Sequence, residues 1–341
     1  MGTAIGGLVV KEEIELGYLR GRLVGIDSYN IIYQFLSSIR GPDGTPLMDA
    51  DGNVTSHLTG LLYRTVNLLE KGVKPVFVFD GKPPKLKQKT IEERKKIRTD
   101  AIEKHEKALK EGNMEDAKKF GSRALRLSDE MISDAKKLLG FMGLPVIEAP
   151  SEGEAQISQM CLKGKIFGCV SQDYDSLLFG TPLLLRNISV SGKRKVPGKN
   201  FYVDVAPEKI ELSKNLEALG ISREKLIWLG ILIGTDFNEK FPMIGPKKAL
   251  SLVKKFGSFE EIVKETGFEP GFDYKEIEEI FLNPPYSPDF KIEFQLPDRE
   301  KILDFLVTQH GFSSIRVESA LKKLGEKSSE KGGQSSLEKW F

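Results

Sequence analysis

The sequence contains few of the residues that build disulfide, zinc or nucleophile-triad sites. Its 341 residues include two cysteines, Cys161 and Cys169, and three histidines, with no CxxC pair and no Cys/His cluster. This pattern excludes a disulfide framework and argues against a zinc site, and free thiols favour a reducing, intracellular setting. No Ser-His-Asp triad is evident, and the GxSxG nucleophile elbow is missing.

Long apolar runs and nucleotide-binding motifs are missing as well. The chain has no run of about 18 apolar residues, the length needed to span a membrane, and its N-terminus shows no basic and apolar leader. We therefore expect a cytoplasmic protein that is neither secreted nor bound to a membrane. The phosphate-binding Walker A loop does not occur either, which argues against nucleotide-driven chemistry.

The chain has almost no net excess of positive over negative charge, but its charged residues are unevenly distributed. The net charge is only +2, yet the segment from Lys82 to Arg126 holds 15 Lys and Arg against 8 Asp and Glu. A basic segment beside an acidic pocket fits a polyanion that is held against metal ions. A solvated, salt-bridged helical hairpin explains the same charges at least as well.

Apolar runs that alternate with helical patterns predict the fold class. Five runs typical of buried strands occur at 23–26, 75–79, 145–149, 168–171 and 182–188. Helical patterns lie between them, so we expect an α/β fold with a mostly parallel central sheet flanked by helices. The charged segment at about 82–135 is too long for an ordinary crossover and predicts a helical arch above the sheet.

The second half of the chain predicts helices, a tight turn and a tail. From about Pro207 the pattern is helical, and the turn FPMIGPKK at 241–248 predicts a helix-hairpin-helix element for DNA binding over about 222–257. Gly245 would allow close backbone approach, and the turn amides with Lys247 and Lys248 would bind phosphate without reading sequence. A Gly-Pro turn is also common between helices without any ligand. We expect one domain over 1–325 and a polar, flexible tail over 326–341.

Seven acids follow predicted strands or an apolar helix. The carboxyl ends of parallel strands form the crevice where ligands bind, so these acids should converge there. Each one alone could be a helix cap or a first-turn acid. Together they would repel one another without a compensating charge, which Mg²⁺ or Mn²⁺ would supply through oxygen ligands. The acids are Asp27, Asp80, Glu152, Glu154, Asp173, Asp175 and Asp236.

Three further residues could serve such a site. Two divalent ions about 4 Å apart suit an in-line phosphoryl displacement. Lys87 and Arg94 share one helix face and could clamp a scissile phosphate, although two solvated residues would have the same spacing. Tyr33 could stack on an unpaired base or could be an ordinary core aromatic.

The last eight residues, QSSLEKWF, read as a docking motif. Gln334, Leu337 and Trp340 recur at intervals of three, and Phe341 follows. A single 3₁₀ turn would place the first three on one side, and an aromatic pair is typical of binding hot spots. The polar linker before it favours a partner protein over docking onto the chain's own core.

Taken together, these stretches resemble the structure-specific 5′ nucleases, and most closely the archaeal type of flap endonuclease. The resemblance covers about residues 1–325. It rests on motifs in the family's order and spacing: VGIDSYNIIYQF, PVFVFDGKPPKLK, APSEGEAQ, SQDYDSLLFG and LIGTDFN. It implies cleavage of branched DNA that carries a 5′ flap, with 5′–3′ exonuclease activity, in Okazaki-fragment maturation and base-excision repair. The flap would pass through the helical arch.

The resemblance also implies a role for each site residue. Two Mg²⁺ ions would be held, with Mn²⁺ as a substitute. Lys87 and Arg94 match the family's basic residues above the scissile phosphate, and Tyr33 matches its base-stacking aromatic. Asp80, Glu152 and Glu154, with Asp27 assisting, would serve one ion, and Asp173, Asp175 and Asp236 the other.

The tail resembles the family's motif for the sliding clamp of the proliferating cell nuclear antigen type. The chain stops at this motif without a long basic extension, which resembles the archaeal form and suggests no nuclear import signal. We expect a nucleoid-associated protein that is a monomer by itself. One departure lies in the hairpin turn, where Met243 replaces the first glycine of the usual G-x-G-P-K pattern. A ribonuclease or phosphatase with the same acidic pocket, and a DNA-binding module without activity, are the alternatives.

Overall fold

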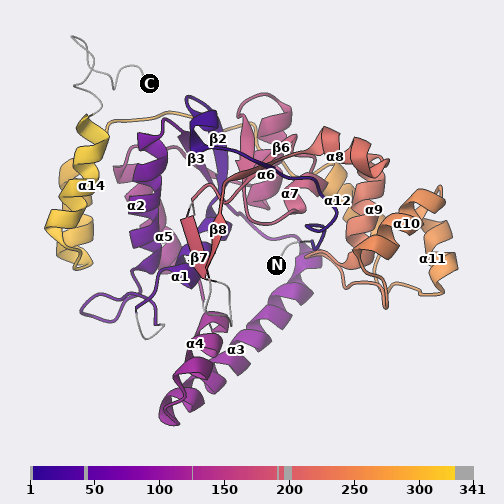
Figure 1. Cartoon of the computed structure of the whole chain (residues 1–341), viewed down its shortest axis with the longest axis horizontal. Helices are drawn as coiled ribbons and strands as arrows, with labels where there is room; N and C mark the ends of the chain where they lie inside the picture. The colour runs from indigo at the N-terminus through magenta and orange to yellow at the C-terminus, as the bar shows by residue number, and fades with distance from the viewer. Residues whose placement is uncertain (1–2, 42–44, 125, 190–191, 196–201, 327–341) are drawn as a thin grey trace.

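A mixed sheet forms the centre of the molecule (Figure 1). The computed structural model describes residues 3–41, 45–124, 126–189, 192–195 and 202–326. Within these ranges seven strands form one sheet, in the spatial order β1 (Glu12–Glu13), β9 (Glu208–Glu211), β6 (Leu183–Arg186), β5 (Gly168–Val170), β2 (Leu23–Asp27), β3 (Lys74–Phe79) and β4 (Val146–Glu148). The strands from β6 to β4 pair in parallel, whereas β9 and β1 are antiparallel additions. The predicted α/β class is confirmed.

Both faces of the central strands are buried, which explains their continuous apolar runs. In β3, Phe77 and Phe79 enter the core on one face, and Val76 and Val78 enter the core on the other. This alternation follows from the two-residue period of a strand.

Helices cover the sheet on two sides and extend it at one end (Figure 1). One face shares its core with α1 (Ser28–Ser38), α2 (Ser56–Glu70), α5 (Asp129–Phe141), α13 (Arg299–Leu303) and α14 (Ser314–Glu326). The other face packs on α6 (Gly153–Leu162). A further core joins α7 (Asp175–Leu178), α8 (Leu212–Leu219), α9 (Arg223–Ile233), α10 (Pro246–Lys255), α11 (Phe259–Thr266) and α12 (Tyr274–Leu282). No helix in the described ranges is long and apolar enough to cross a membrane.

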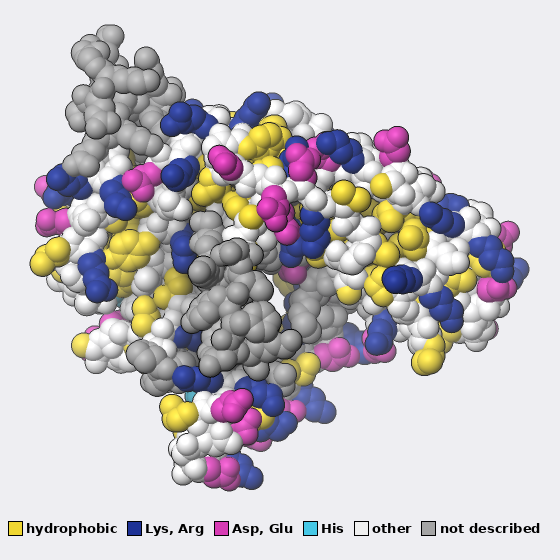
Figure 2. Space-filling view, in the orientation of Figure 1, with side chains coloured by type: hydrophobic (Ala, Val, Ile, Leu, Met, Phe, Trp, Pro, Cys, Tyr) yellow, Lys and Arg dark blue, Asp and Glu magenta, His cyan; other side chains and the backbone are white. Residues whose placement is uncertain are grey.

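A charged hairpin of two helices projects from this body (Figure 1). It consists of α3 (Gln88–Lys110) and α4 (Met114–Arg123). The two helices pack closely, with His105 Nδ1 2.7 Å from the carbonyl oxygen of Ala117. In Figure 2 its basic side chains are interleaved with acidic ones. The predicted arch boundary near 135 is too late, because α5 already packs into the main core through Ala135 and Leu138.

Three strand features were not predicted. The chain was expected to be helical from about Pro207, but residues 208–211 form β9. Only Ile210 of this strand is buried, so its sequence EKIE carries too little apolar pattern to indicate a strand. β1 has the same weakness. A separate antiparallel pair forms from β7 (Gly192–Lys195) and β8 (Tyr202–Val205).

The predicted docking motif cannot be placed in this fold. Residues 327–341, with Gln334, Leu337, Trp340 and Phe341, lie outside the described residues. The last described helix, α14, packs through Val317 and Leu321 against the core shared by α1 and α2.

Candidate active site

The carboxyl ends of the parallel strands bring acids from distant segments together. Asp27 is the last residue of β2, and Asp80 directly follows β3. Asp173 lies three residues after β5. Burial raises the pKa of Asp27 well above its usual range, and the nearby charges of Asp80 and Asp173 raise it further. The predicted convergence at this edge of the sheet is therefore present in the structure.

Contacts with helix N-termini explain Asp27 and Asp80 but not Glu152 and Asp173. Asp80 Oδ1 accepts a hydrogen bond at 2.7 Å from the backbone amide of Gly153, the first residue of α6. Asp27 is the N-cap of α1, and its Oδ1 accepts a hydrogen bond from the backbone amide of Asn30 at 3.0 Å. Glu152 occupies the N-cap position of α6, yet its side chain makes no capping bond. Asp173 caps no helix and instead accepts a hydrogen bond from Asn30 Nδ2 at 2.9 Å.

The remaining acids join the same cluster from α6, α7 and the loop after α9. Burial raises the pKa of Glu154 well above its usual range, and the charges of Asp27 and Asp175 add to this. Burial likewise raises the pKa of Asp175 to about 6, helped by Asp236 and opposed by two hydrogen bonds from Thr3. The cluster is thus held together against its own repulsion.

Lys87 and Arg94 supply positive charge at this cluster. Lys87 Nζ contacts Glu152 Oε2 and lies 3.3 Å from Asp236 Oδ2, and Arg94 Nη2 donates to Asp236 Oδ1. Burial lowers the pKa of Lys87, but the charges of Glu152 and Asp236 outweigh it and raise the pKa overall. The Lys87 side chain is only 13% exposed. The solvated alternative is therefore wrong for Lys87.

The donor chemistry of the cluster suits hard divalent cations. Every acid offers carboxylate oxygens, and Glu154 Oε1 is buried with no hydrogen-bond partner among the described residues. Such an orphaned acceptor is costly unless a cation occupies its vicinity. In the described part of the chain, no group of three or more His, Cys, Asp and Glu side chains is arranged to hold an ion as it stands. Lys87 lies between Glu152 and Asp236, and it keeps their charges compensated in this arrangement.

Several residues at the cluster were missed by the sequence analysis. Asn30 bonds both Asp27 and Asp173, Ser171 Oγ lies 3.4 Å from Asp27 Oδ2, and Thr3 bonds Asp175. Asn30 was detectable in principle, because a polar residue one turn into α1 faces the end of its own strand. Thr3 carried no such signal.

The predicted aromatic and hairpin residues lie on exposed surfaces. Tyr33 is 38% exposed on α1, so it is not a fully buried core aromatic. In the predicted helix-hairpin-helix region, Gly245 is the N-cap of α10 and Lys247 and Lys248 are exposed. Met243 adopts a left-handed φ of 58° and is 90% exposed. The turn therefore keeps, with methionine, a conformation that favours glycine.

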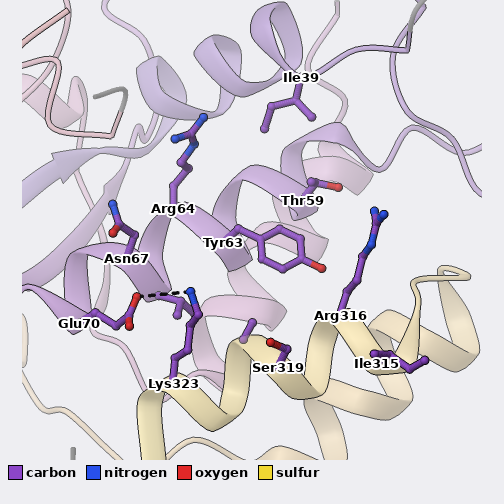
Figure 3. Close-up of a pocket in the computed structure, with 12 residues that line it drawn as sticks. Ile39, Thr59, Tyr63, Arg64, Asn67, Glu70, Ile315, Arg316, Ser319 and Lys323 are labelled. Carbon is purple, nitrogen blue, oxygen red and sulfur yellow. Dashed lines mark ion pairs between the residues drawn. The ribbon is translucent and has the colours of Figure 1, made fainter. Parts of the chain in front are cut away.

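A basic groove lies apart from the acids, between α2 and α14 (Figure 3). Its volume is about 800 Å³. Arg64 of α2 and Arg316 of α14 project on either side of the Tyr63 ring (Figure 3). Lys323 Nζ lies 3.8 Å from Glu70 Oε2, so these two charges offset each other. The two arginines then give the groove a net positive charge.

Comparison with known proteins gives the same family in three ways. The XPG N-terminal domain matches residues 6–101, and the XPG I-region matches residues 143–236. Flap endonuclease 1 of Staphylothermus marinus is 52% identical over 353 aligned residues, which cover all of both chains. Flap endonuclease 1 of Archaeoglobus fulgidus is 50% identical, again over the full length of both.

A solved structure agrees with the sequences. Flap endonuclease-1 from Methanococcus jannaschii superposes with a TM-score of 0.75 at 40% identity, covering 95% of this chain and 98% of that one. The catalytic core of Rad2 in complex with DNA substrate, at 23% identity and a TM-score of 0.70, shares the fold. The matched regions contain all seven acids, Lys87 and Arg94. The chain therefore belongs to the flap endonuclease family, whose members are metal-dependent nucleases that act on DNA.

Proposed function

We propose that this protein is a Mg²⁺-dependent endonuclease that cleaves branched DNA at a 5′ flap and also has 5′–3′ exonuclease activity. The observation that carries the proposal is the cluster of seven acids from separate segments beside Lys87 and Arg94. A binding module without activity has no use for such acids, which would repel phosphate. The family supports a role in DNA replication and repair, and we propose that the protein acts at the nucleoid.

The family resemblance supports two groups of ligands. Asp80, Glu152 and Glu154, with Asp27 assisting, would hold one ion. Asp173, Asp175 and Asp236 would hold the other. Two Mg²⁺ ions, or Mn²⁺ in their place, would supply an activated water and stabilise the leaving oxygen.

The chain's own basic groups hold the phosphate. Lys87 and Arg94 already touch carboxylates of the cluster, and the same ammonium and guanidinium groups would bind the scissile phosphate as it enters. Arg94 presents two parallel N–H donors, which suits bidentate phosphate binding. Tyr33, exposed on α1, would stack on the base next to the cut.

Two basic surfaces would bind the duplex arms of the branched substrate. They lie at opposite ends of the molecule's long axis (Figure 1). At the α9–α10 turn, a Cβ on Gly245 would meet no protein atom, so the free space suits a phosphate beside Lys247 and Lys248. Arg64 and Arg316 of the α2–α14 groove would contact the other arm.

A substrate comparison tests the proposed activity. We expect cleavage of 5′-flap DNA with Mg²⁺ or Mn²⁺, none with EDTA, and much slower turnover of single-stranded RNA and of a small phosphomonoester. Gel analysis of end-labelled substrates measures all three. Equal cleavage of RNA would favour the ribonuclease alternative, and metal-independent DNA binding without any cleavage would favour the binding module.

The C-terminal motif is proposed to bind a ring-shaped sliding clamp. Deleting residues 334–341 should abolish clamp binding in surface plasmon resonance and leave cleavage of free flap DNA unchanged. Because the sequence predicts a polar tail that ends in the docking motif, the unfolding temperature should stay the same. A large drop in that temperature would show that the tail belongs to the core instead.

A further inference from the structure

The N-terminal segment is anchored in the core of α7 to α12 and on α8. Ile5 is fully buried in the core of α7 to α12. Further along, the backbone amide of Val10 donates to Asn215 Oδ1 at 2.6 Å, and Asn215 Nδ2 donates back to the carbonyl of Val10 at 3.2 Å. The segment is therefore anchored on both sides of residues 6–9.

The same segment packs against the residue between two of the acids. A Cβ on Gly6 would lie 2.8 Å from Tyr174 Oη, so a larger residue there would displace the Tyr174 ring. Tyr174 is fixed from its other side by Arg186, whose Nη1 donates to Tyr174 Oη at 2.6 Å. The segment and Arg186 together hold the loop that carries Asp173 and Asp175.

Thr3 contacts the carboxylate of Asp175 directly. Its backbone amide donates to Asp175 Oδ1 at 2.6 Å, and its hydroxyl Oγ1 donates to the same oxygen at 2.5 Å. Thr3 is 2% exposed and Asp175 is 8% exposed, so solvent competes little with either bond. Across the described part of the chain, Oδ2 of Asp175 accepts no hydrogen bond, which leaves it available to a cation.

We propose that Thr3 is a positioning residue that fixes the Asp175 carboxylate for one divalent ion, by occupying Oδ1 and leaving Oδ2 for the metal. This inference rests on the proposed function, in which Asp175 is a ligand. Outer partners of this kind orient ligating carboxylates, and their loss typically costs about 10- to 100-fold in metal affinity. Thr3, near the N-terminus, would thereby support a metal site whose ligands come mainly from the ends of the parallel strands.

Paired substitutions separate positioning from simple anchoring. Thr3→Val removes the hydroxyl and keeps the side-chain shape and the backbone amide, whereas Thr3→Ser keeps the hydroxyl. Mn²⁺ binding to the full-length protein without DNA, measured by calorimetry, is the primary readout. We expect about tenfold weaker Mn²⁺ binding for Thr3→Val, near-normal binding for Thr3→Ser, and unchanged unfolding temperatures in EDTA. The Mg²⁺ concentration for half-maximal flap cleavage should rise in parallel for Thr3→Val, with little change at saturating Mg²⁺.

Two outcomes overturn the inference in distinguishable ways. Wild-type affinity for Mn²⁺ in Thr3→Val, or equal losses in both variants together with lower unfolding temperatures, would show that Thr3 only anchors the segment. If the wild-type protein bound no Mn²⁺ and cut no flap, the proposed function itself would fail, and the role of Thr3 with it.

Discussion

Replacing Asp173 by alanine should reduce the rate of 5′-flap cleavage at saturating Mg²⁺ by at least about 10²-fold. Loss of a residue that only hydrogen-bonds to a metal ligand typically reduces metal affinity or activity about 10- to 100-fold. Asp173 is proposed to bind the ion directly, so its loss should cost at least as much. Binding of flap DNA should persist, because removing a negative charge from the cluster does not weaken its attraction for phosphate. Single-turnover cleavage and fluorescence anisotropy in EDTA measure the two effects.

A matched variant guards against general effects of the substitution. Asp289→Ala removes an exposed acid from the connector after α12 and should leave both cleavage and binding unchanged. Asp173 accepts a hydrogen bond from Asn30, so the unfolding temperature of Asp173→Ala must also be compared with that of the wild type. Full cleavage activity in a folded Asp173→Ala protein would overturn the metal assignment for this acid.

Replacing Lys87 by methionine should have two opposite effects. Cleavage should fall by about 10²- to 10³-fold, the usual loss when one donor to a transition-state charge is removed. Binding of Mn²⁺ without DNA should become tighter, because Lys87 competes with an ion for the carboxylates of Glu152 and Asp236. The metal-free variant should also lose up to about 3 kcal/mol of stability, since it leaves buried carboxylates without their partner.

Lys89→Met provides the control for this experiment. Lys89 lies in the first turn of α3, two residues after the N-cap Lys87, and pairs with Glu239, but both side chains are exposed. Exposed pairs contribute little, so this variant should resemble the wild type in cleavage, metal binding and stability. Weaker Mn²⁺ binding in Lys87→Met would contradict the competition between the ammonium group and the ion.

The convergence of the acids could be predicted because it depends on a general property of parallel sheets. Once 23–26, 75–79 and 168–171 are recognised as buried parallel strands, Asp27, Asp80 and Asp173 must lie at one edge. The residues that support these acids could not be predicted in this way. Thr3 meets Asp175 across 172 positions of sequence, and no local period or motif connects them.

Weakly patterned strands were the other source of error. β7, β8 and β9 have four residues each, and β7 and β9 are largely polar, so their pairing depends on neighbours that the local sequence does not show. The predicted end of the helical arch near residue 135 was wrong for a different reason. Charge continues from α3 into the segment before α5, while the burial that separates arch from core follows only from the tertiary packing of Ala135 and Leu138.

The two edge strands of the sheet affect whether the protein can aggregate at high concentration. The outermost strands, β1 and β4, have two and three residues, and both carry glutamates. Lys209 Nζ lies 3.1 Å from Glu12 Oε1 at one edge, and Lys136 Nζ lies 2.7 Å from Glu148 Oε1 at the other. Such short, charged edges give a second molecule little backbone to pair with. The sheet therefore resists edge-to-edge pairing with a second molecule.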